Sequence, residues 1–172
     1  ADAGGLRDQF HPVVDIAPTI LAAAGVAMPS HVDGIEQMPV EGMSILGACD
    51  DPGADGRRTQ YFEMMGNRGI YHDGFMASCF HGRVPWVRFG SAPFDGPQER
   101  WELYDLREDF SQGHDLADEQ PERLAEMQDL FDAECRRNGV YPLRDATPNL
   151  DPAAPAPSVP AGVTRMTYTT AH

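Results

Sequence analysis

Apolar positions near the start of the chain predict a strand followed by a helix. The segment 10–25 reads FHPVVDIAPTILAAAG, and its first apolar residues predict a short strand: Phe10, Val13 and Val14. Asp15 is expected to cap the helix, Pro18 is tolerated in its first turn, and Gly25 supplies the stop. The helix would carry one apolar face, made of Ile16, Ile20, Leu21 and Ala24.

The middle of the chain predicts a small antiparallel sheet. Four short stretches rich in apolar and aromatic residues lie between turn signals, at 60–64, 68–72, 75–80 and 100–106. Gly66-Asn67 and Asp73-Gly74 separate the first three, and both pairs are typical of hairpin turns. These stretches therefore predict four antiparallel strands.

A second helix is predicted at 121–138, followed by an extended tail. One side of this helix would be apolar, and Asn138-Gly139 would end it. The tail contains TPNLDPAAPAPSVPAG, which has too little apolar bulk to fold by itself. The fold class is therefore α+β: a strand and helix left from another α/β layer, a four-stranded antiparallel sheet with a C-terminal helix, and a Pro/Ala-rich tail.

The same pattern gives the boundaries of the parts. We expect the strand and helix within 1–27, a long turn-rich surface loop at 28–59, the sheet plus helix subdomain at 60–145, and an extended or disordered tail at 146–172.

Charge and cysteine content narrow the classes of function. The net charge is −14, and all 13 basic residues are arginine, so the chain has no lysine. An acidic surface repels phosphate and anionic lipid, which disfavours binding of nucleic acid or of a membrane surface. No apolar run approaches the roughly 20 residues of a membrane span. The three cysteines form no CxxC or zinc-type cluster, so we expect free thiols, with a single disulfide as the alternative.

Three segments carry a family resemblance. They read QFHPVVDIAPTILAAAGV, RRTQYFEMMGNRGIYHDGFMAS and WELYDLREDFSQGHDLADEQPERLAEMQDLFDAECRRNGVYPL. In this order and spacing they resemble the C-terminal portion of bacterial arylsulfatases, of the alkaline-phosphatase-like superfamily. The resemblance implies a large N-terminal α/β catalytic domain, whose end would be residues 1–27, and a smaller domain with a four-stranded sheet and a long helix. The catalytic domain would then be the missing partner of this chain, which we expect to be truncated.

The chemistry that the resemblance implies has no residues here to perform it. Such enzymes hydrolyse sulfate esters with a formylglycine made from Cys or Ser in [CS]-x-P-x-R, and with a divalent cation, usually calcium. No cysteine of this chain begins that motif, and Ser91 and Ser158 have Asp95 and Gly162 where the arginine is required. The chain also lacks an Asp-Asn pair for the cation. We therefore expect no catalytic residue, metal ligand or cofactor in this chain, and no activity from it alone.

Four residues remain as candidates for the rim of a substrate pocket: Asn67, Arg68, His72 and Asp73. A carboxylate beside a histidine favours the imidazolium, which suits an anionic sulfate. The alternative is that Asp73-Gly74 is simply a turn and His72 the end of a strand.

Three functions stay open. The first is a C-terminal part of an arylsulfatase-like sulfuric ester hydrolase that contributes scaffold and pocket rim. The second is a stand-alone, non-catalytic binding module. The third is a part of a related phosphodiesterase or phosphonate hydrolase. The pattern does not choose between a cytoplasmic and a periplasmic location.

Overall fold

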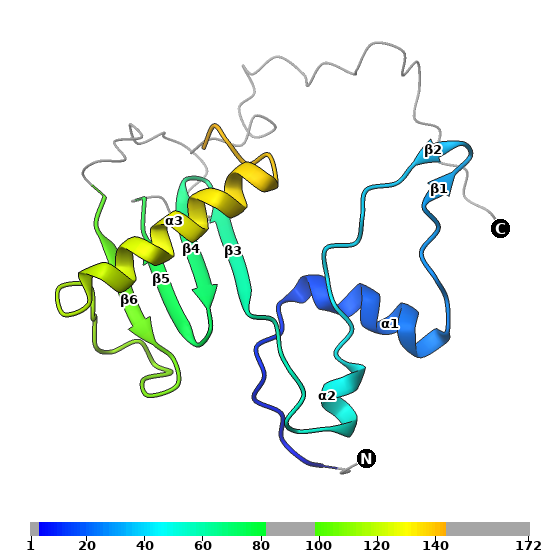
Figure 1. Cartoon of the computed structure of the whole chain (residues 1–172), viewed down its shortest axis with the longest axis horizontal. Coiled ribbons are helices and arrows are strands. Elements are labelled where there is room, and N and C mark those ends of the chain that lie inside the picture. The colour runs from blue at the N-terminus through cyan, green and yellow to red at the C-terminus, as the bar shows by residue number, and fades with distance from the viewer. Residues whose placement is uncertain (1–3, 82–98, 144–172) are drawn as a thin grey trace.

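The computed structural model describes residues 4–81 and 99–143 (Figure 1). Its elements follow one another in the order 3₁₀ turn, helix, hairpin, short helix, four strands and long helix. Their bounds are η1 Val13–Asp15, α1 Ile16–Ala24, β1 His31–Val32, β2 Ile35–Glu36, α2 Leu46–Asp50, β3 Thr59–Met64, β4 Asn67–His72, β5 Phe75–Cys79, β6 Trp101–Asp105 and α3 Pro121–Arg137.

The predicted four-stranded sheet is confirmed. Its strands lie in the order β3-β4-β5-β6, and each is antiparallel to its neighbour. Asp73 and Gly74 form the turn between β4 and β5, both with positive φ (45° and 87°), as in a two-residue hairpin turn. The turn between β3 and β4 is Met65-Gly66, one residue earlier than predicted, because Asn67 already pairs with Met64.

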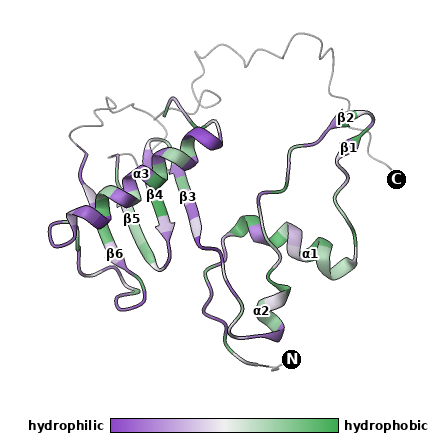
Figure 2. Cartoon of the chain, viewed as in Figure 1, coloured by the Kyte–Doolittle hydropathy of each residue, from purple (hydrophilic) through white to green (hydrophobic). Residues whose placement is uncertain are grey.

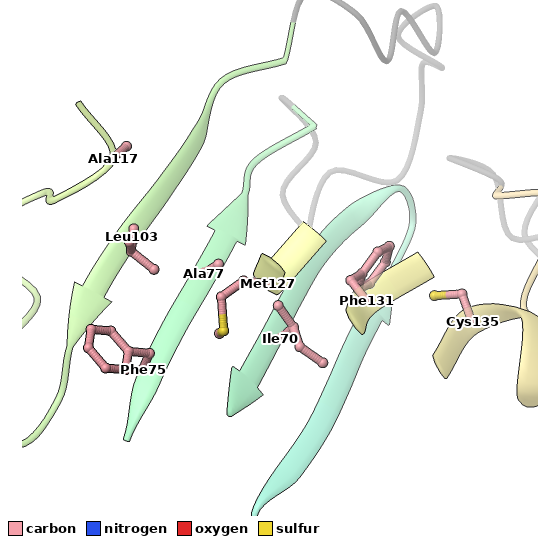
Figure 3. Close-up of a cluster of buried hydrophobic side chains, with 8 residues drawn as sticks. All are labelled: Ile70, Phe75, Ala77, Leu103, Ala117, Met127, Phe131 and Cys135. Atoms are coloured by element: carbon pink, nitrogen blue, oxygen red, sulfur yellow. The ribbon is translucent and has the colours of Figure 1, made fainter. Parts of the chain in front are cut away.

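Helix α3 packs across one face of the sheet and completes the core (Figures 1 and 3). Neighbouring strands point fully buried side chains towards the helix. The helix packs against them with Met127, Phe131 and Cys135, which are four positions apart, as the predicted apolar side requires. The ring of Phe131 lies edge-on to Trp101, with 5.6 Å between centroids. The core cluster consists of Ile70, Phe75, Ala77, Leu103, Ala117, Met127, Phe131 and Cys135.

The prediction of a strand at the start of the chain is wrong. Val13–Asp15 forms a 3₁₀ turn, which the Asp15 N–H closes on the Pro12 carbonyl at 3.0 Å. A lone strand leaves its N–H and C=O groups unpaired, whereas the turn satisfies them locally. The predicted helix is confirmed as α1, and Gly25 ends it in a left-handed conformation with φ 66°.

The segment predicted as a long surface loop contains more structure than expected. Asp33 and Gly34 have φ of 51° and 79° and join β1 and β2 in a small hairpin, and α2 follows it. The Asp-Gly pair is itself a hairpin signal, so the prediction overlooked local turn chemistry. The predicted tail at 146–172 lies outside the described residues, as do Ser91 and Ser158.

Most of the apolar face of α1 is exposed in the described part of the chain, and Figure 2 colours much of this helix as hydrophobic. Ile20 is 62 % exposed, and Val13 and Ile16 are exposed beside it. In the residues that the structure describes, no helix is long and apolar enough to cross a membrane. The fold as a whole is α+β, and its core cluster is formed by the sheet, α3 and Ala117 from the turn before α3.

Candidate functional site

The four residues predicted for the pocket rim all lie on or beside β4, but at its two ends. Asn67 and Arg68 begin the strand, while His72 ends it and Asp73 opens the following turn. A strand rises about 3.3 Å per residue, so the two pairs are separated by roughly 16 Å. The structure therefore brings them together in pairs and not as one group of four.

At the turn end of β4, Asp73 is held by Arg58, which lies just before β3. Arg58 donates from Nε to Asp73 Oδ1 at 2.8 Å and from Nη2 to Oδ2, a bidentate pair. The hydrogen bond from Arg58 keeps the pKa of Asp73 below its usual value. His72 contacts Thr59 Oγ1 through Nδ1 at 2.7 Å, and its Nε2 lies 3.5 Å from Asp73 Oδ2. The main partner of Asp73 is therefore Arg58 and not His72.

At the opposite end of β4, the side chains of Asn67 and Arg68 are held by His81 and Glu99. The Asn67 side-chain oxygen accepts the His81 backbone N–H at 2.9 Å. Arg68 is ion-paired with Glu99, which also contacts His81 Nδ1, and its guanidinium lies 5.4 Å from the centroid of the Trp101 ring. The Arg68 side chain is only 9 % exposed, so its charge interacts mainly with these internal partners.

A buried carboxylate, which the sequence pattern predicted only as a helix cap, organises the N-terminal part. Asp15 is 1 % exposed and accepts hydrogen bonds from Arg57 Nη2 at 2.6 Å and from the Met43 N–H at 2.9 Å. His11 Nδ1 lies 3.3 Å from its other oxygen. Asp15 thus joins the start of α1 to the segments around residues 43 and 57.

The predicted role of Asp15 as a side-chain helix cap is wrong. Its carboxylate makes no cap hydrogen bond to α1, because its oxygens are taken by Arg57, Met43 and His11. Burial by itself raises the pKa of Asp15, but the hydrogen bond from Arg57 and those from Met43 and His11 more than offset this, so the pKa lies below 3.8. The arginine pair at 57–58 was the available signal for a carboxylate partner. A local sequence pattern does not show which carboxylate that is, because Asp15 lies 42 residues away from Arg57.

Neither cofactor that the resemblance implies finds its ligands or its precursor among the residues that the structure describes. Within 4–81 and 99–143, no group of three or more His, Cys, Asp or Glu is placed to hold a metal ion. The sequence has no [CS]-x-P-x-R motif from which a formylglycine could be made. All three cysteines are free thiols, and two of them, Cys79 and Cys135, are buried. No catalytic step through either group is derived for this chain.

No model of a known protein family matches the chain. It is similar to BT4656 in complex with its substrate D-glucosamine-2-N,6-O-disulfate, with 21 % identity and a TM-score of 0.49 over 75 % of this chain and 24 % of that one. It is also similar to BT33336S-sulf, from work on glycosaminoglycan metabolism by Bacteroides thetaiotaomicron, with 16 % identity and a TM-score of 0.48 over 72 % and 24 % of the two chains. A third is Ps i-CgsB with k-i-k-neocarrahexaose, at 18 % identity and a TM-score of 0.43 over 78 % and 26 %.

The chain spans about a quarter of the length of these solved structures. A likeness at this level does not extend their activities or substrates to this chain. The charged side chains at the two ends of β4 are engaged in ion pairs within the chain, and Asp15 forms a buried ion pair with Arg57.

Proposed function

We propose that this chain is the C-terminal part of a sulfatase-like enzyme, in which it supplies scaffold and part of the rim of the substrate pocket. The observation that carries the proposal is the sheet with α3, which forms where the resemblance to arylsulfatases requires it. The finer proposal is that the whole enzyme hydrolyses aryl sulfates. In this proposal the divalent cation and the formylglycine belong to the catalytic domain that the chain lacks.

The turn end of β4 is the part of the described surface that suits a pocket rim. Arg58 is exposed and fixed by Asp73, and His72 stands beside them. A cationic group held in place before the ligand arrives loses little freedom on binding an anion, which favours a sulfate ester.

The test uses the protein encoded by the reading frame around this chain. An upstream segment with [CS]-x-P-x-R is expected, and the complete protein should hydrolyse 4-nitrophenyl sulfate while the 172-residue chain does not. In the complete protein, His72→Ala should change KM across several aryl sulfates. Hydrolysis of bis(4-nitrophenyl) phosphate without hydrolysis of the sulfate would instead establish the related phosphodiesterase.

The exposed apolar face of α1 favours one other function, a stand-alone binding module. Ile16 and Ile20 point their side chains into solvent in the described chain, and a partner that covered them would gain hydrophobic free energy. Sedimentation of the chain, alone and mixed with the N-terminal part of the complete protein, separates the two ideas. A complex of the two supports the part of a larger enzyme, whereas a chain that stays a monomer beside that part supports the module.

A further inference from the structure

A cavity of about 680 Å³ lies where the N-terminal segment meets one end of the sheet. One wall is the segment 7–11, and the other is formed by Tyr71, Gly74, Leu106, Arg107 and Phe110. Small-molecule sites in proteins occupy roughly 300–1,000 Å³ and combine aromatic surface with a few fixed polar groups. The cavity has the size of such a site, and its lining contains both kinds of group.

Aromatic rings provide the apolar surface of the cavity. Phe10 stacks on Tyr71 with 3.9 Å between the ring centroids, so the N-terminal segment is fixed against the sheet. Phe110 is 85 % exposed, although burying a phenylalanine ring is favourable by roughly 1.5–3 kcal/mol. A flat ligand ring that covered Phe110 would recover part of that free energy.

Two arginines, Arg7 and Arg107, line the cavity of a chain whose net charge is −14. Arg107 is held by Asp105, which accepts from its Nε at 2.8 Å and from its Nη2 at 2.5 Å. Its guanidinium also lies 4.6 Å from the centroid of the Phe75 ring. A guanidinium has five N–H donors, so Arg107 keeps donors for a ligand while its position is already fixed.

Arg7 is fixed in a similar way by backbone carbonyls. It donates to Ala48 at 2.5 Å, to Leu6 at 2.8 Å and to Cys49 at 3.1 Å. The cavity lining contains one carboxylate, Asp8, and Asp105 pairs with Arg107, so the two arginine charges are balanced. An anionic ligand would therefore be held by the guanidinium N–H groups that these pairs leave over and not by a net positive charge.

Two buried polar atoms in the wall have no hydrogen-bond partner among the described residues. They are Gln9 Oε1 and His11 Nε2. The amide of Gln9 is oriented by its Nε2, which donates to the carbonyls of Pro52 at 2.7 Å and Ala54 at 3.2 Å. Both atoms are buried, so the polar side chains of the cavity that a ligand could contact are those of Arg7, Asp8 and Arg107.

We propose that this cavity binds a sulfate ester carried on a ring, with the ring against Phe110 and Tyr71 and the sulfate on Arg107. The inference rests on the proposed function, because it takes the sulfate ester from there. Sugars and aryl groups both offer a flat ring face, so the shared chemistry is a ring with one sulfate, and the experiment distinguishes the two sources.

The 172-residue chain is titrated by calorimetry with galactose 6-sulfate, galactose, 4-nitrophenyl sulfate, 4-nitrophenol and inorganic sulfate. At least one sulfated ring compound is expected to bind ten or more times as tightly as its unsulfated counterpart and as inorganic sulfate. The compound that does so identifies the ring. Equal binding of the unsulfated ring, equal binding of inorganic sulfate, or no binding of either ester overturns the proposal.

Variants place the ligand in this cavity. Arg107→Gln should weaken binding of the ester at least tenfold, whereas Arg100→Gln, at the other end of β6 and comparably exposed, should leave it within twofold. Phe110→Ala should weaken it at least threefold, and Phe80→Ala, which removes another exposed ring, should not. Circular dichroism checks the fold of each variant. Because Phe110 is almost fully exposed, its variant decides the matter if Arg107→Gln unfolds the chain; unchanged affinity in Phe110→Ala would then refute the site.

The outcomes separate this inference from the proposed function. Binding that depends on Arg107 and Phe110, in a complete protein that hydrolyses no sulfate ester, refutes the proposed function and keeps the site. Hydrolysis of sulfate esters that survives both substitutions with unchanged KM, by a protein whose isolated chain binds no ester, refutes the site and keeps the function.

Discussion

Asp15 holds three separate segments of the N-terminal part through one carboxylate. Its partners Arg57 and Met43 come from segments 42 and 28 residues further along the chain. Thr19 adds to the same junction, because its hydroxyl donates to the Asp15 carbonyl at 2.6 Å and accepts from the Ile45 N–H at 3.0 Å. The N-terminal part has few buried apolar side chains, so these polar contacts carry much of its order.

Replacing Asp15 by Asn should destabilise the chain by about 2–4 kcal/mol, since it leaves the buried end of Arg57 without its counter-charge. Urea unfolding at pH 7 measures the change. The matched control is Asp118→Asn, whose side chain is almost fully exposed and which should change the free energy of unfolding by less than about 0.5 kcal/mol. Equal effects of the two substitutions would show that the Asp15 contacts add nothing.

The same carboxylate predicts a pH dependence. The folded chain keeps the pKa of Asp15 below its ordinary value of 3.8, so the folded state binds this proton less readily than the unfolded state. The stabilisation is fully present above pH 3.8 and is lost as the pH falls through the lowered pKa. The difference in unfolding free energy between the native chain and Asp15→Asn should therefore shrink below about pH 4. A difference that stays constant down to pH 3 would contradict this.

The three thiols should react at very different rates. Cys49 is exposed, whereas Cys79 and Cys135 are buried, and burial raises the pKa of the Cys135 thiol to about 11. Only a thiolate attacks a disulfide reagent, so Cys135 stays unreactive at pH 8. We expect Ellman's reagent to modify one thiol rapidly in the folded chain and all three in guanidinium chloride. Fast reaction of two or three thiols without denaturant would refute the burial.

At the level of elements, the sequence predicts best where local chemistry is decisive. Asp73-Gly74 can adopt positive φ cheaply, so the β4–β5 hairpin followed directly from the sequence, and the apolar spacing in α3 gave its buried side. The strand predicted at 10–14 failed because apolar residues alone do not supply a pairing partner. The rim residues were predicted as neighbours in sequence, but β4 is extended and separates Arg68 from His72. Asp15 and the cavity beside Arg107 depend on contacts across more than 25 residues, which no local pattern contains.

Loss of an apolar side chain should destabilise the chain strongly on α3 and hardly at all on α1. Phe131 on α3 is 3 % exposed and packs against Trp101, so Phe131→Ala should cost about 3–5 kcal/mol. Ile20 on α1 is mostly exposed, so Ile20→Ala should change stability by less than about 0.5 kcal/mol. Thermal and urea unfolding of both variants measures this. A large loss in Ile20→Ala would mean that the face of α1 is covered in the chain itself.

The whole molecule has its apolar core in one half. Every residue of the core cluster lies between positions 70 and 135, in the sheet, in α3 or, for Ala117, in the turn before α3. Helices α1 and α2 and the small hairpin lie to the other side (Figure 1). The two sides meet where Phe10 stacks on Tyr71 and lies edge-on to Phe62, with 6.5 Å between the centroids of Phe10 and Phe62. Order in the N-terminal part thus depends on a few contacts with the sheet and on the junction at Asp15.

Amide hydrogen exchange should reveal this asymmetry. Amides of β4, β5 and α3 lie within the core and open only on global unfolding, so their exchange should be slowest and should report the global stability. Amides of α1 have hydrogen bonds but little buried apolar cover, so local opening should release them with a smaller free energy. In the complete enzyme that we propose, contact with the catalytic domain should slow the exchange of α1 and leave that of α3 nearly unchanged. Equal protection of α1 and α3 in the isolated chain would show that the apolar face of α1 does not need to be covered by another domain. It would also remove the main reason for expecting a domain or protein that binds to α1.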